Sequence, residues 1–501
     1  RKSSRSVARP VQASRMRPPL SPQAFVAQSR AAFLAGPSAG ATASATVWVG
    51  NVAGDLDTIV SAVCAAYCRQ VQGAEPASRQ HVPLVPFPRP DFRLRQDACL
   101  LFRHCGFDFD SEGAVESLLY FPDEAAAPAE AWRGAGALSV ALTDHNRLAE
   151  HFAASLGDVV VEVIDHHSDE RAHLSSSGGA RLIDTSAGSA CSLVSELLPP
   201  DPPHLLCVLL LGAIAADTRG FDAAQQKFVG RDVAAVRRLM ALLSAADVGG
   251  GGEAGEAGAG EVGAGEAGVG RAEVEAAAAD LRGAALPAAA AVGGAATFGE
   301  LAARLLDARY DVSSLDVHDL LRLDYKQARA GELEVGVCAI FVPLRELIAR
   351  AGGGGALSAA MAAFGGRSGV DVLFALSAED RAAGGSGLKG VSVVPLTPGG
   401  RGAAAALASA LEAAPEGLPP SLASQPLFVK QQLGGQRDAR REAAWSERAA
   451  PPHLALNTRA QPAPPGPLPL RRRCPCAAAR RTTRSPVAPP VRRDRRVWHR
   501  V

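Results

Sequence analysis

Short apolar runs, each ending in a polar turn, recur along the first half of the 501-residue chain and alternate with helix-forming segments. Residues 159–164 are the clearest run, because they are β-branched and almost continuously apolar, as in a strand buried on both faces. Residues 46–50 and 138–143 are similar, and residues 82–87 predict an edge strand, since prolines cannot donate to a ladder. The helical segments are residues 58–67, 96–105 and 205–216. This alternation predicts an α/β domain built on a mostly parallel sheet.

A second, smaller α/β pattern begins near residue 297. It comprises helices at residues 298–309, 314–321 and 344–351 and strands at residues 332–341, 371–376 and 390–394. We therefore expect a first domain over residues 45–248 and a smaller α/β domain over residues 297–447.

Three stretches lack this patterning. Residues 249–296 are rich in Gly, Ala and Glu and predict a flexible linker; a G-x-G-x-x-G match within them follows no strand and is a chance match. Residues 448–501 are rich in Pro and Arg and predict a disordered tail. Residues 1–44 are basic without any acidic residue, and suit either an organellar transit peptide or a disordered tail, with a short helix at residues 22–34.

Composition narrows the class of protein. The formal net charge is +1, so no overall field indicates nucleic acid or a membrane surface as a partner. The longest apolar run, residues 205–216, is too short to cross a bilayer. Nine cysteines are scattered without a zinc-binding pattern, which is typical of reduced thiols in an intracellular protein. We expect a cytoplasmic location, with a plastid or mitochondrion as the alternative if residues 1–44 are a transit peptide.

Carboxylate and imidazole side chains gather where predicted strands end. Asp165, His166 and His167 directly follow the clearest apolar run, and Asp144 and His145 follow another. The carboxyl ends of strands in open α/β sheets are where ligands and metals bind. For one such stretch, a strand that simply ends in polar residues is an equal alternative, but the recurrence of the pattern favours a divalent-cation site.

Further candidate residues lie at similar junctions. Asp55 and Asp57 alternate across the turn after the first strand without a basic neighbour, so they would repel each other unless a cation holds them. A helix N-cap explains one of the two at most. Asp217 ends the apolar helix, and Gly188 and Ser189 open a helix whose backbone N–H groups can bind phosphate.

The order of these residues resembles that of the motifs of DHH phosphoesterases. The matching segments are Asn51-x3-Asp55-x-Asp57, Asp144-His145-Asn146, Asp165-His166-His167, Gly188-Ser189 and Asp217-Thr218. The resemblance covers residues 45–245 and is greatest to the branch of exopolyphosphatases and prune proteins, with family II inorganic pyrophosphatases as relatives. It implies a parallel-sheet DHH domain, a smaller DHH-associated substrate-binding domain, and an active site in the cleft between them.

The resemblance implies two divalent metal ions, Mg²⁺ first and Mn²⁺ as the alternative. Asp144 would bridge the ions. The remaining ligands would be Asp57, His166 and Asp217 on one ion and Asn51 and Asp55 on the other. Family II pyrophosphatases carry His where Asn51 stands, and an amide oxygen is a harder ligand than imidazole, which favours Mg²⁺.

Phosphate contacts are implied in the same way. They would come from His145, His167, Gly188, Ser189, Lys326 and Arg440. His167 would donate a hydrogen bond or a proton to the leaving phosphate, and Lys326 lies in an Asp-x-Lys segment like that of the family. Arg440 is the nearest match to the family's terminal basic motif but lacks its serine, so Lys389 is a second candidate.

The predicted reaction is hydrolysis of terminal phosphoanhydride bonds in inorganic polyphosphate, with release of orthophosphate. An inorganic pyrophosphatase or a nucleotide phosphodiesterase on the same site is an alternative, and a prune-like interaction protein with weak catalysis is another. The full set of acidic ligands favours an enzyme, with Asp144, His167, Lys326 and Arg440 in catalytic roles. Neither nucleic acid nor a membrane is expected as a partner, and the sequence leaves the oligomeric state open.

Overall fold

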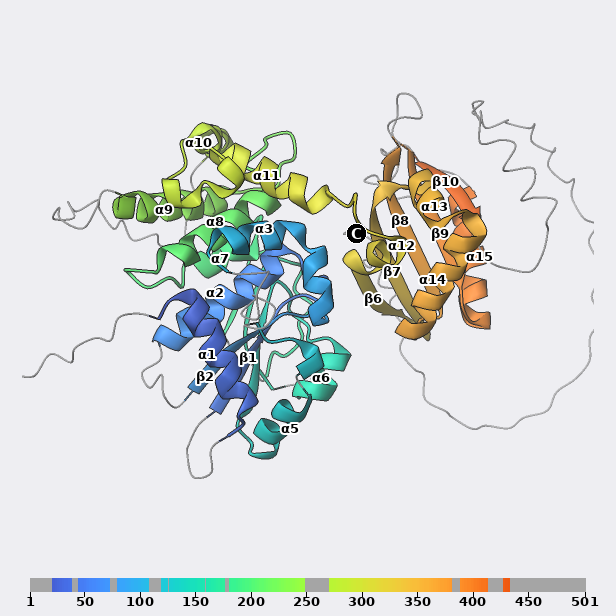
Figure 1. The fold of residues 1–501 in the computed structure, drawn as a ribbon, viewed down its shortest axis with the longest axis horizontal. Coiled ribbons are helices and arrows are strands. Elements are labelled where there is room, and N and C mark those ends of the chain that lie inside the picture. The colour runs from blue at the N-terminus through green and yellow to red at the C-terminus, as the bar shows by residue number, and fades with distance from the viewer. Residues whose placement is uncertain are drawn as a thin grey trace, which may run out of the picture. The chain divides into compact units, whose positions relative to one another are not determined.

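The computed structural model describes residues 20–37, 44–72, 79–107, 119–124, 126–157, 159–175, 180–247, 270–380, 388–412 and 427–432. Two α/β domains can be followed in Figure 1, and each has its own five-stranded sheet. The tail predicted at residues 448–501, together with Arg440, lies outside the described residues.

The first sheet is entirely parallel and has the order β2-β1-β3-β4-β5. Its strands are β1 (Ser44–Val49), β2 (Arg79–Leu84), β3 (Leu138–Thr143), β4 (Val160–Asp165) and β5 (Arg181–Ile183). The prediction of a mostly parallel α/β domain is thereby confirmed. β2 is an edge strand, as its proline requires: Pro83 pairs with Trp48 of β1.

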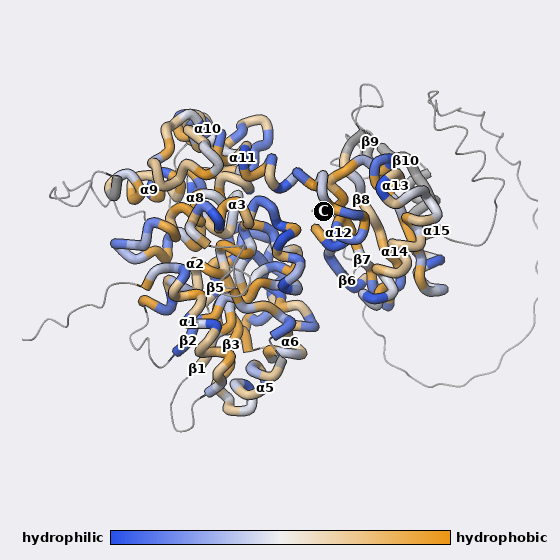
Figure 2. Tube along the Cα trace, in the orientation of Figure 1, coloured by the Kyte–Doolittle hydropathy of each residue, from blue (hydrophilic) through white to orange (hydrophobic). Residues whose placement is uncertain are grey.

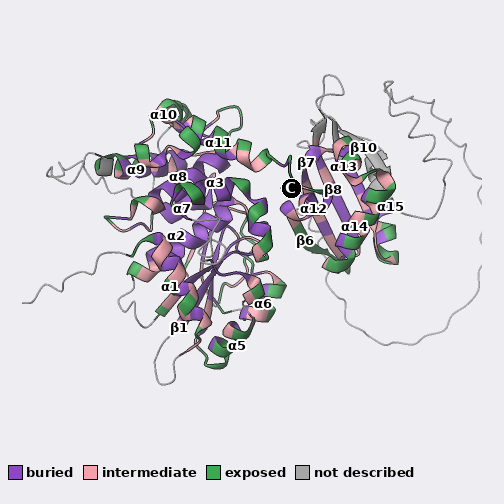
Figure 3. Ribbon diagram, viewed as in Figure 1, coloured by how far each residue is buried: buried purple, intermediate pink, exposed green. Residues whose placement is uncertain are grey.

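Side chains of β1 alternate between two cores, one on each face of the sheet. Val47 and Val49 are buried in one core and Trp48 in the other. Both faces are therefore covered, which explains the near-continuous apolar runs in the sequence. Figure 2 shows hydrophobic residues concentrated along the strands of this domain, and Figure 3 shows these strands as buried.

Helices of several lengths cover the two faces. They are α1 (Pro22–Leu34), α2 (Leu56–Gln72), α3 (Gln96–His104), α5 (Ala126–Gly134), α6 (Glu150–Leu156), α7 (Ala190–Ser195), α8 (His204–Asp217) and α9 (Gly230–Asp247). Short 3₁₀ segments are Arg89–Leu94, Pro122–Glu124, Ala288–Ala290 and Val292–Gly294. α1 confirms the short helix predicted at residues 22–34: the Ser21 side chain caps it, and Phe25 and Phe33 are buried.

The linker predicted at residues 249–296 is wrong from residue 270 onward, where the structure has the helix α10 (Arg271–Gly283). Ala and Glu have high helix propensity, and Val274, Ala278 and Leu281 pack at a spacing of four and three residues against the first core. The surrounding alanines hide this period in the sequence. Residues 248–269 lie outside the described residues.

The helix α11 (Phe298–Tyr310) also belongs to the first core, although we predicted that the second domain begins at residue 297. Phe298, Leu301 and Leu305 are buried there, and the ring of Phe298 contacts that of Phe221. The hydrophobic core of the second domain consists of residues from Val312 onward, joined by Leu94. An amphipathic helix does not reveal from its sequence which of two neighbouring cores it joins.

The second sheet is mixed, in the order β10-β9-β8-β7-β6. Its strands are β6 (Tyr325–Ala330), β7 (Leu333–Pro343), β8 (Val372–Asp380), β9 (Leu388–Pro395) and β10 (Leu427–Gln432). The helices of this domain are α12 (Val317–Leu323), α13 (Leu344–Ala351), α14 (Gly354–Ser368) and α15 (Pro398–Glu412). α14 and α15 were not predicted, because both are rich in Ala and Gly.

No single helix among the described residues is both long and apolar enough to span a membrane. One pair, Leu344–Ala351 with Gly354–Ser368, reaches the required length and composition only when taken together, and is bent by 88° at its break.

Candidate active site

The candidate site lies at the carboxyl edge of the first sheet. In the order β2-β1-β3-β4-β5, the topological switch point falls between β1 and β3, where ligands bind in open α/β sheets. Asn51, Asp55 and Asp57 follow β1, and Asp144 follows β3. His166 follows the neighbouring strand β4. Parallel strands bring these residues, distant in the sequence, to the same edge.

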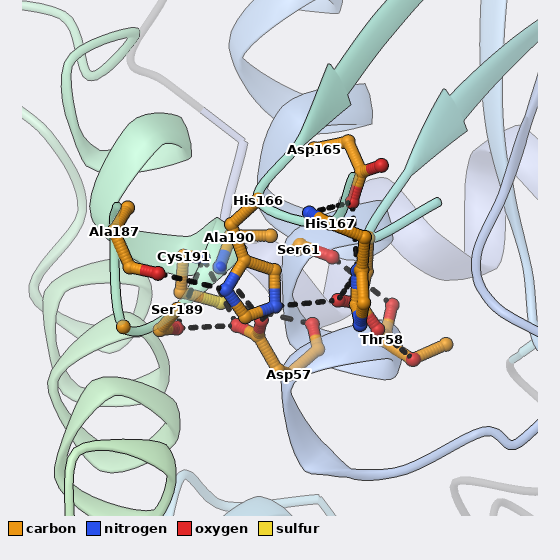
Figure 4. Close-up of polar contacts among 12 residues, drawn as sticks. Asp57, Thr58, Ser61, Asp165, His166, His167, Ala187, Ser189, Ala190 and Cys191 are labelled. Carbon is orange, nitrogen blue, oxygen red and sulfur yellow. Dashed lines mark hydrogen bonds and ion pairs between the residues drawn. The ribbon is translucent and has the colours of Figure 1, made fainter. Parts of the chain in front are cut away.

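Asp144 and two imidazoles form the centre of the site. Asp144 Oδ1 lies 3.1 Å from Nε2 of His166 and 3.6 Å from Nδ1 of His167. Oδ2 of Asp57 lies 3.8 Å from the same His166 Nε2 (Figure 4). Ligand atoms of Asp144, His166 and His167 all lie within 4.8 Å of one another.

This geometry fits a divalent cation. In octahedral coordination with bonds of about 2.1 Å, adjacent ligand atoms lie about 3 Å apart. The separation of 3.1 Å between Asp144 Oδ1 and His166 Nε2 has this value, and the 3.8 Å to Asp57 Oδ2 is close to it. Asp144, His166 and His167 thus form a group that could hold a divalent ion, and Asp57 Oδ2 lies beside His166 Nε2.

Asp144 is held in place by Thr58 of α2 and by Asn51 of the loop after β1. Thr58 Oγ1 donates a hydrogen bond of 2.5 Å to Asp144 Oδ2, and Asn51 Nδ2 donates one of 3.3 Å to the Asp144 carbonyl oxygen. Oδ1 of Asn51 accepts from the Ala53 N–H at 3.1 Å. Since an amide oxygen has two lone pairs, Asn51 retains one for the metal ligation that the sequence predicts.

Asp57 caps the amino terminus of α7. Its carboxylate accepts hydrogen bonds from Ser189 Oγ at 2.6 Å, from the Ala190 N–H at 2.7 Å and from the Cys191 N–H at 2.9 Å. The N–H groups that we expected to face phosphate are thus directed at a carboxylate. The roles predicted for Gly188 and Ser189 in substrate binding stay predictions.

Carboxylates crowd this edge of the sheet strongly enough to affect each other's ionisation. Burial and the charges of Asp57 and Asp55 raise the pKa of Asp217, at the end of α8, well above its usual range. Burial and the same two charges raise the pKa of Asp144 to about 6. Ionised carboxylates so placed are stabilised by cations. Asp55 also caps α2, because its Oδ1 accepts from the Thr58 N–H at 3.1 Å.

His166 is oriented by a backbone carbonyl. Its Nδ1 lies 3.0 Å from the Ala187 oxygen (Figure 4), whereas its Nε2 faces Asp144. Burial lowers the pKa of His166, but the hydrogen bond to Asp144 and the charge of Asp57 outweigh burial and raise it to about 11. In the metal-free site, a proton on this imidazole therefore neutralises part of the carboxylate charge.

His167 is paired with Asp165, a fully buried carboxylate. Asp165 Oδ1 accepts from His167 Nδ1 at 2.9 Å, and Oδ2 accepts from Asn146 Nδ2 at 2.5 Å. Burial opposes charge on His167, but the contacts with Asp165 and Asp144 outweigh it and raise the pKa of His167. The His167 side chain is 39% exposed, so the opposite side of its ring is open to a ligand.

His145 lies beside this pair without joining it. Its Nδ1 donates to the Thr143 carbonyl oxygen at 2.9 Å, and its buried Nε2 has no hydrogen-bond partner among the described residues. Burial lowers the pKa of His145, so the ring is neutral near pH 7. The substrate contact predicted for His145 stays a prediction.

The residues predicted in the second domain are placed only in part. Lys326 is exposed and is the second residue of β6. Burial tends to raise the pKa of Asp55, but the charge of Arg309, hydrogen bonds from Thr58 and the charge of Lys326 lower it overall. Lys389 lies in β9, and Arg440 lies outside the described residues.

Sequence reasoning missed four residues that shape the site. They are Thr58, which bonds Asp144; Asp165, which bonds His167; Asp232, which bonds the Gly188 N–H; and Arg309, whose charge acts on Asp55. Asp165 was visible as the first residue of the Asp-His-His segment, but its role was not recognised. The other three occupy ordinary positions at helix ends and gave no local signal.

The segment mispredicted as a linker also supports the site. Arg282 of α10 donates from Nη1 to the carbonyl oxygens of Arg219 and Gly220, at 3.0 and 2.7 Å. These two residues follow Asp217 by two and three positions. α10 therefore holds in place the loop that directly follows the candidate metal ligand Asp217.

Comparison with known proteins agrees with this two-domain arrangement. Residues 303–430 match the model of the DHHA2 domain. The putative exopolyphosphatase of Schizosaccharomyces pombe is 26% identical over 208 residues, which are 39% of this chain and 50% of that protein. Human exopolyphosphatase PRUNE1 is 30% identical over 200 residues, which are 39% of this chain and 41% of that protein. The chain thus spans half or less of the length of these curated relatives.

A solved structure is also similar. The putative family II inorganic pyrophosphatase of Methanococcus jannaschii matches 66% of this chain and 82% of its own, with a TM-score of 0.40 and 15% sequence identity.

A parallel-sheet domain with carboxylates and imidazoles at its switch point, followed by a segment that matches the DHHA2 domain, is similar to the arrangement of two-domain DHH proteins. Over 39% of its length, the chain is similar in sequence to proteins of the exopolyphosphatase and prune branch.

Proposed function

We propose that this protein is a metal-dependent hydrolase of phosphoanhydride bonds, and specifically an exopolyphosphatase that releases orthophosphate from the ends of inorganic polyphosphate. The convergence of Asp57, Asp144 and His166, with a second imidazole on the same carboxylate, carries the proposal. The names of the curated relatives support it.

The proposed metal centre holds two divalent ions, with Mg²⁺ favoured over Mn²⁺ because oxygen ligands predominate. Asp144 would be a ligand shared by both ions, with Asp57, His166 and Asp217 as further ligands of one and Asn51 and Asp55 of the other. When bound, such ions lower the pKa of a nucleophilic water and neutralise charge on the phosphoryl oxygens.

His167 is the proposed proton donor to the leaving phosphate. Asp165 accepts a hydrogen bond from the Nδ1–H group and stabilises the imidazolium, so that Nε2 can donate its proton on the open side of the ring. The buried Asp165 also fixes the ring orientation, because it is itself held by Asn146. This gives the second imidazole of the Asp-His-His segment a role separate from that of His166.

Lys326 is proposed to bind phosphoryl oxygens, with either Arg440 or Lys389 as the further clamp. The ammonium group of a flexible lysine can contact and neutralise phosphoryl oxygens at slightly different positions, as binding of successive phosphates of a polyphosphate chain requires. The cytoplasm is the proposed location, with a plastid or mitochondrion as the alternative if residues 1–44 are a transit peptide.

The test is orthophosphate release by the full chain from polyphosphate of defined lengths, compared with pyrophosphate and cyclic nucleotides, each with Mg²⁺ and with Mn²⁺. We expect polyphosphate to give the highest kcat/KM and Asp144→Ala to lose at least about 100-fold in kcat. Preferred turnover of pyrophosphate or of a cyclic nucleotide would reassign the substrate. Absence of turnover with all of them would overturn the proposal and favour an interaction protein.

A further inference from the structure

Asp232, in the first turn of α9, is a fully buried carboxylate that the proposed reaction does not use. Both of its oxygens accept from the Gly188 N–H, at 2.9 and 3.1 Å. Ser192 Oγ donates to it at 2.6 Å and the Val229 N–H at 2.8 Å. Among the described residues it has no ion-pair partner. Burying a carboxylate without a cation lowers the stability of the fold. The groups that donate hydrogen bonds to Asp232 therefore indicate what its burial is for.

The Gly188 N–H and the Ala187 carbonyl are the two ends of one peptide group. The carbonyl oxygen accepts from His166 Nδ1 at 3.0 Å, while the N–H donates to Asp232. In a trans peptide, the C=O and N–H bonds point in opposite directions. His166, the peptide and Asp232 therefore form a continuous line of hydrogen bonds from imidazole to carboxylate.

This line fixes the protonation of the imidazole. A carbonyl oxygen only accepts, so Nδ1 of His166 carries the hydrogen and Nε2 is left for the other side of the ring. On that side, Nε2 faces Asp144 Oδ1 at 3.1 Å and Asp57 Oδ2 at 3.8 Å. Hydrogen bonds in series polarise one another, so the charge of Asp232 makes the Ala187 oxygen a stronger acceptor.

Gly188 is needed for the peptide to approach Asp232. A Cβ at this position would lie 2.3 Å from the Lys227 carbonyl oxygen and 3.2 Å from Asp232 Oδ2. Any side chain would therefore displace the peptide from the carboxylate. The glycine of the Gly188-Ser189 segment thus has a structural reason that does not involve phosphate.

We propose that Asp232 is a positioning residue for the metal centre, acting through the Ala187–Gly188 peptide to hold His166 with its Nε2 directed at the ion. The inference rests on the metal site of the proposed function but not on the choice of substrate. A carboxylate that supports a ligand histidine usually bonds it directly, and removal of such support weakens metal binding about 10- to 100-fold. Here, a peptide group stands between the two.

The test uses the full chain and compares Asp232→Asn with Ser192→Ala. Asp232→Asn keeps the size of the side chain and removes the charge. Ser192→Ala removes one hydrogen bond to the same carboxylate but leaves the Gly188 contact intact, so it controls for lost stability. The first readout is the dissociation constant for Mn²⁺, from the free-ion signal in electron paramagnetic resonance. We expect it to rise about tenfold in Asp232→Asn and to stay within about twofold in Ser192→Ala.

The second readout is the Nδ1–H resonance of His166 in metal-free, ¹⁵N-histidine-labelled protein, assigned with His166→Gln. We expect it to move upfield and to exchange faster with water in Asp232→Asn, because its acceptor is weaker, and to be unaffected in Ser192→Ala. Unchanged Mn²⁺ affinity and an unchanged resonance in Asp232→Asn would overturn the proposal. So would equal effects in both variants, which a merely structural role predicts.

A measurement on the wild type covers the case in which Asp232→Asn does not fold. With ¹⁵N-glycine labelling, the Gly188 N–H should resist hydrogen exchange and shift when Mg²⁺ is added. A freely exchanging Gly188 N–H that ignores Mg²⁺ would also overturn the proposal. None of these readouts uses turnover, so failure of the polyphosphate assay and failure of this inference can be told apart.

Discussion

The hydroxyl of Ser189 donates a hydrogen bond of 2.6 Å to the carboxylate of Asp57, across 132 positions in the sequence. This contact joins the helix α2, which carries a candidate ligand, to the start of α7. It also gives Ser189 a purpose other than the phosphate contact that the family resemblance implies. If Ser189 supports Asp57, its substitution should lower stability. If it contacts phosphate, its substitution should raise KM.

Ser189→Ala should lower the free energy of unfolding by about 2 kcal/mol, because the hydrogen bond to the buried Asp57 and the N-cap bond from the Cys191 N–H are both lost. The N–H groups of Ala190 and Cys191 would still hold Asp57, so KM for polyphosphate should change less than about threefold. Urea unfolding and initial rates measure the two effects. Ser186→Ala, on the same loop but bonded to Asp184, is the control. A rise in KM of tenfold or more would instead place Ser189 on the substrate.

Asp165→Asn should lower kcat about 100-fold with little effect on KM, because His167 loses the anion that orients its ring and stabilises its charge. His167→Gln should have a similar effect. Since the two residues act as one unit, the double variant should be no slower than His167→Gln by more than about threefold. Steady-state kinetics of the three variants decides this. Multiplicative losses would show that Asp165 acts independently of His167.

Much of the first domain could be predicted from sequence because its strands are β-branched and buried on both faces. β3 and the helix α13 have the bounds predicted for them. α10 and α14 were missed, since alanine and glycine give little contrast between a buried and an exposed helix face. What hides these helices is thus composition rather than unusual geometry.

The candidate ligands could be predicted for a different reason. Parallel strands end at one edge, so polar residues after β1, β3 and β4 are neighbours in space whatever their separation in sequence. No such rule applies to Asp232, which lies 44 positions from Gly188. An acidic residue in the first turn of a helix is ordinarily explained by the helix dipole alone. Supporting residues of this kind become visible only when the chain is folded.

Asp144→Asn should stabilise the metal-free protein, although it should abolish turnover. Burial and the charges of Asp55 and Asp57 raise the pKa of Asp144 to about 6, so its ionised form opposes folding at neutral pH. With metal added, the wild type should become the more stable of the two. An ion at 100 times its dissociation constant stabilises the wild type by about 2.7 kcal/mol, and stabilises the variant by less. Thermal unfolding with chelator and with Mg²⁺ measures both. A variant that is less stable than the wild type in chelator would contradict this account.

His81 should make the fold sensitive to acid at a place remote from the metal site. Its Nδ1 accepts a hydrogen bond of 3.0 Å from Trp48 Nε1, which requires a neutral ring. Burial and the charges of Arg79 and Arg69 lower the pKa of His81 to about 4 from an ordinary value of 6.5. The unfolded chain therefore takes up a proton first as pH falls. The contribution of neutral His81 to the free energy of unfolding is complete above pH 6.5. It falls by about 3 kcal/mol between pH 6.5 and pH 4.

Urea unfolding of the metal-free protein at several pH values measures this loss. His81→Gln, whose side-chain oxygen can accept from Trp48, should remove most of the pH dependence in that window. If the wild type and the variant lose stability in parallel, the acid sensitivity arises elsewhere, for example at the carboxylate cluster.

Arg309 and Asp97 join α11 to α3 within the first domain, by a contact of 2.6 Å from Nε to Oδ2. The side chains are 17% and 4% exposed, and the charges of Asp55 and Asp217 also act on Arg309. Arg309→Met and Asp97→Leu should each lower the free energy of unfolding by about 3 kcal/mol, since each leaves a buried charge unpaired. The double variant should lose clearly less than the sum of the two. Arg304→Met, on an exposed position of the same helix, should change stability by less than about 0.5 kcal/mol. Additive losses in urea unfolding would mean that the two charges are compensated separately, and that α11 is held to the first domain by its apolar side chains alone.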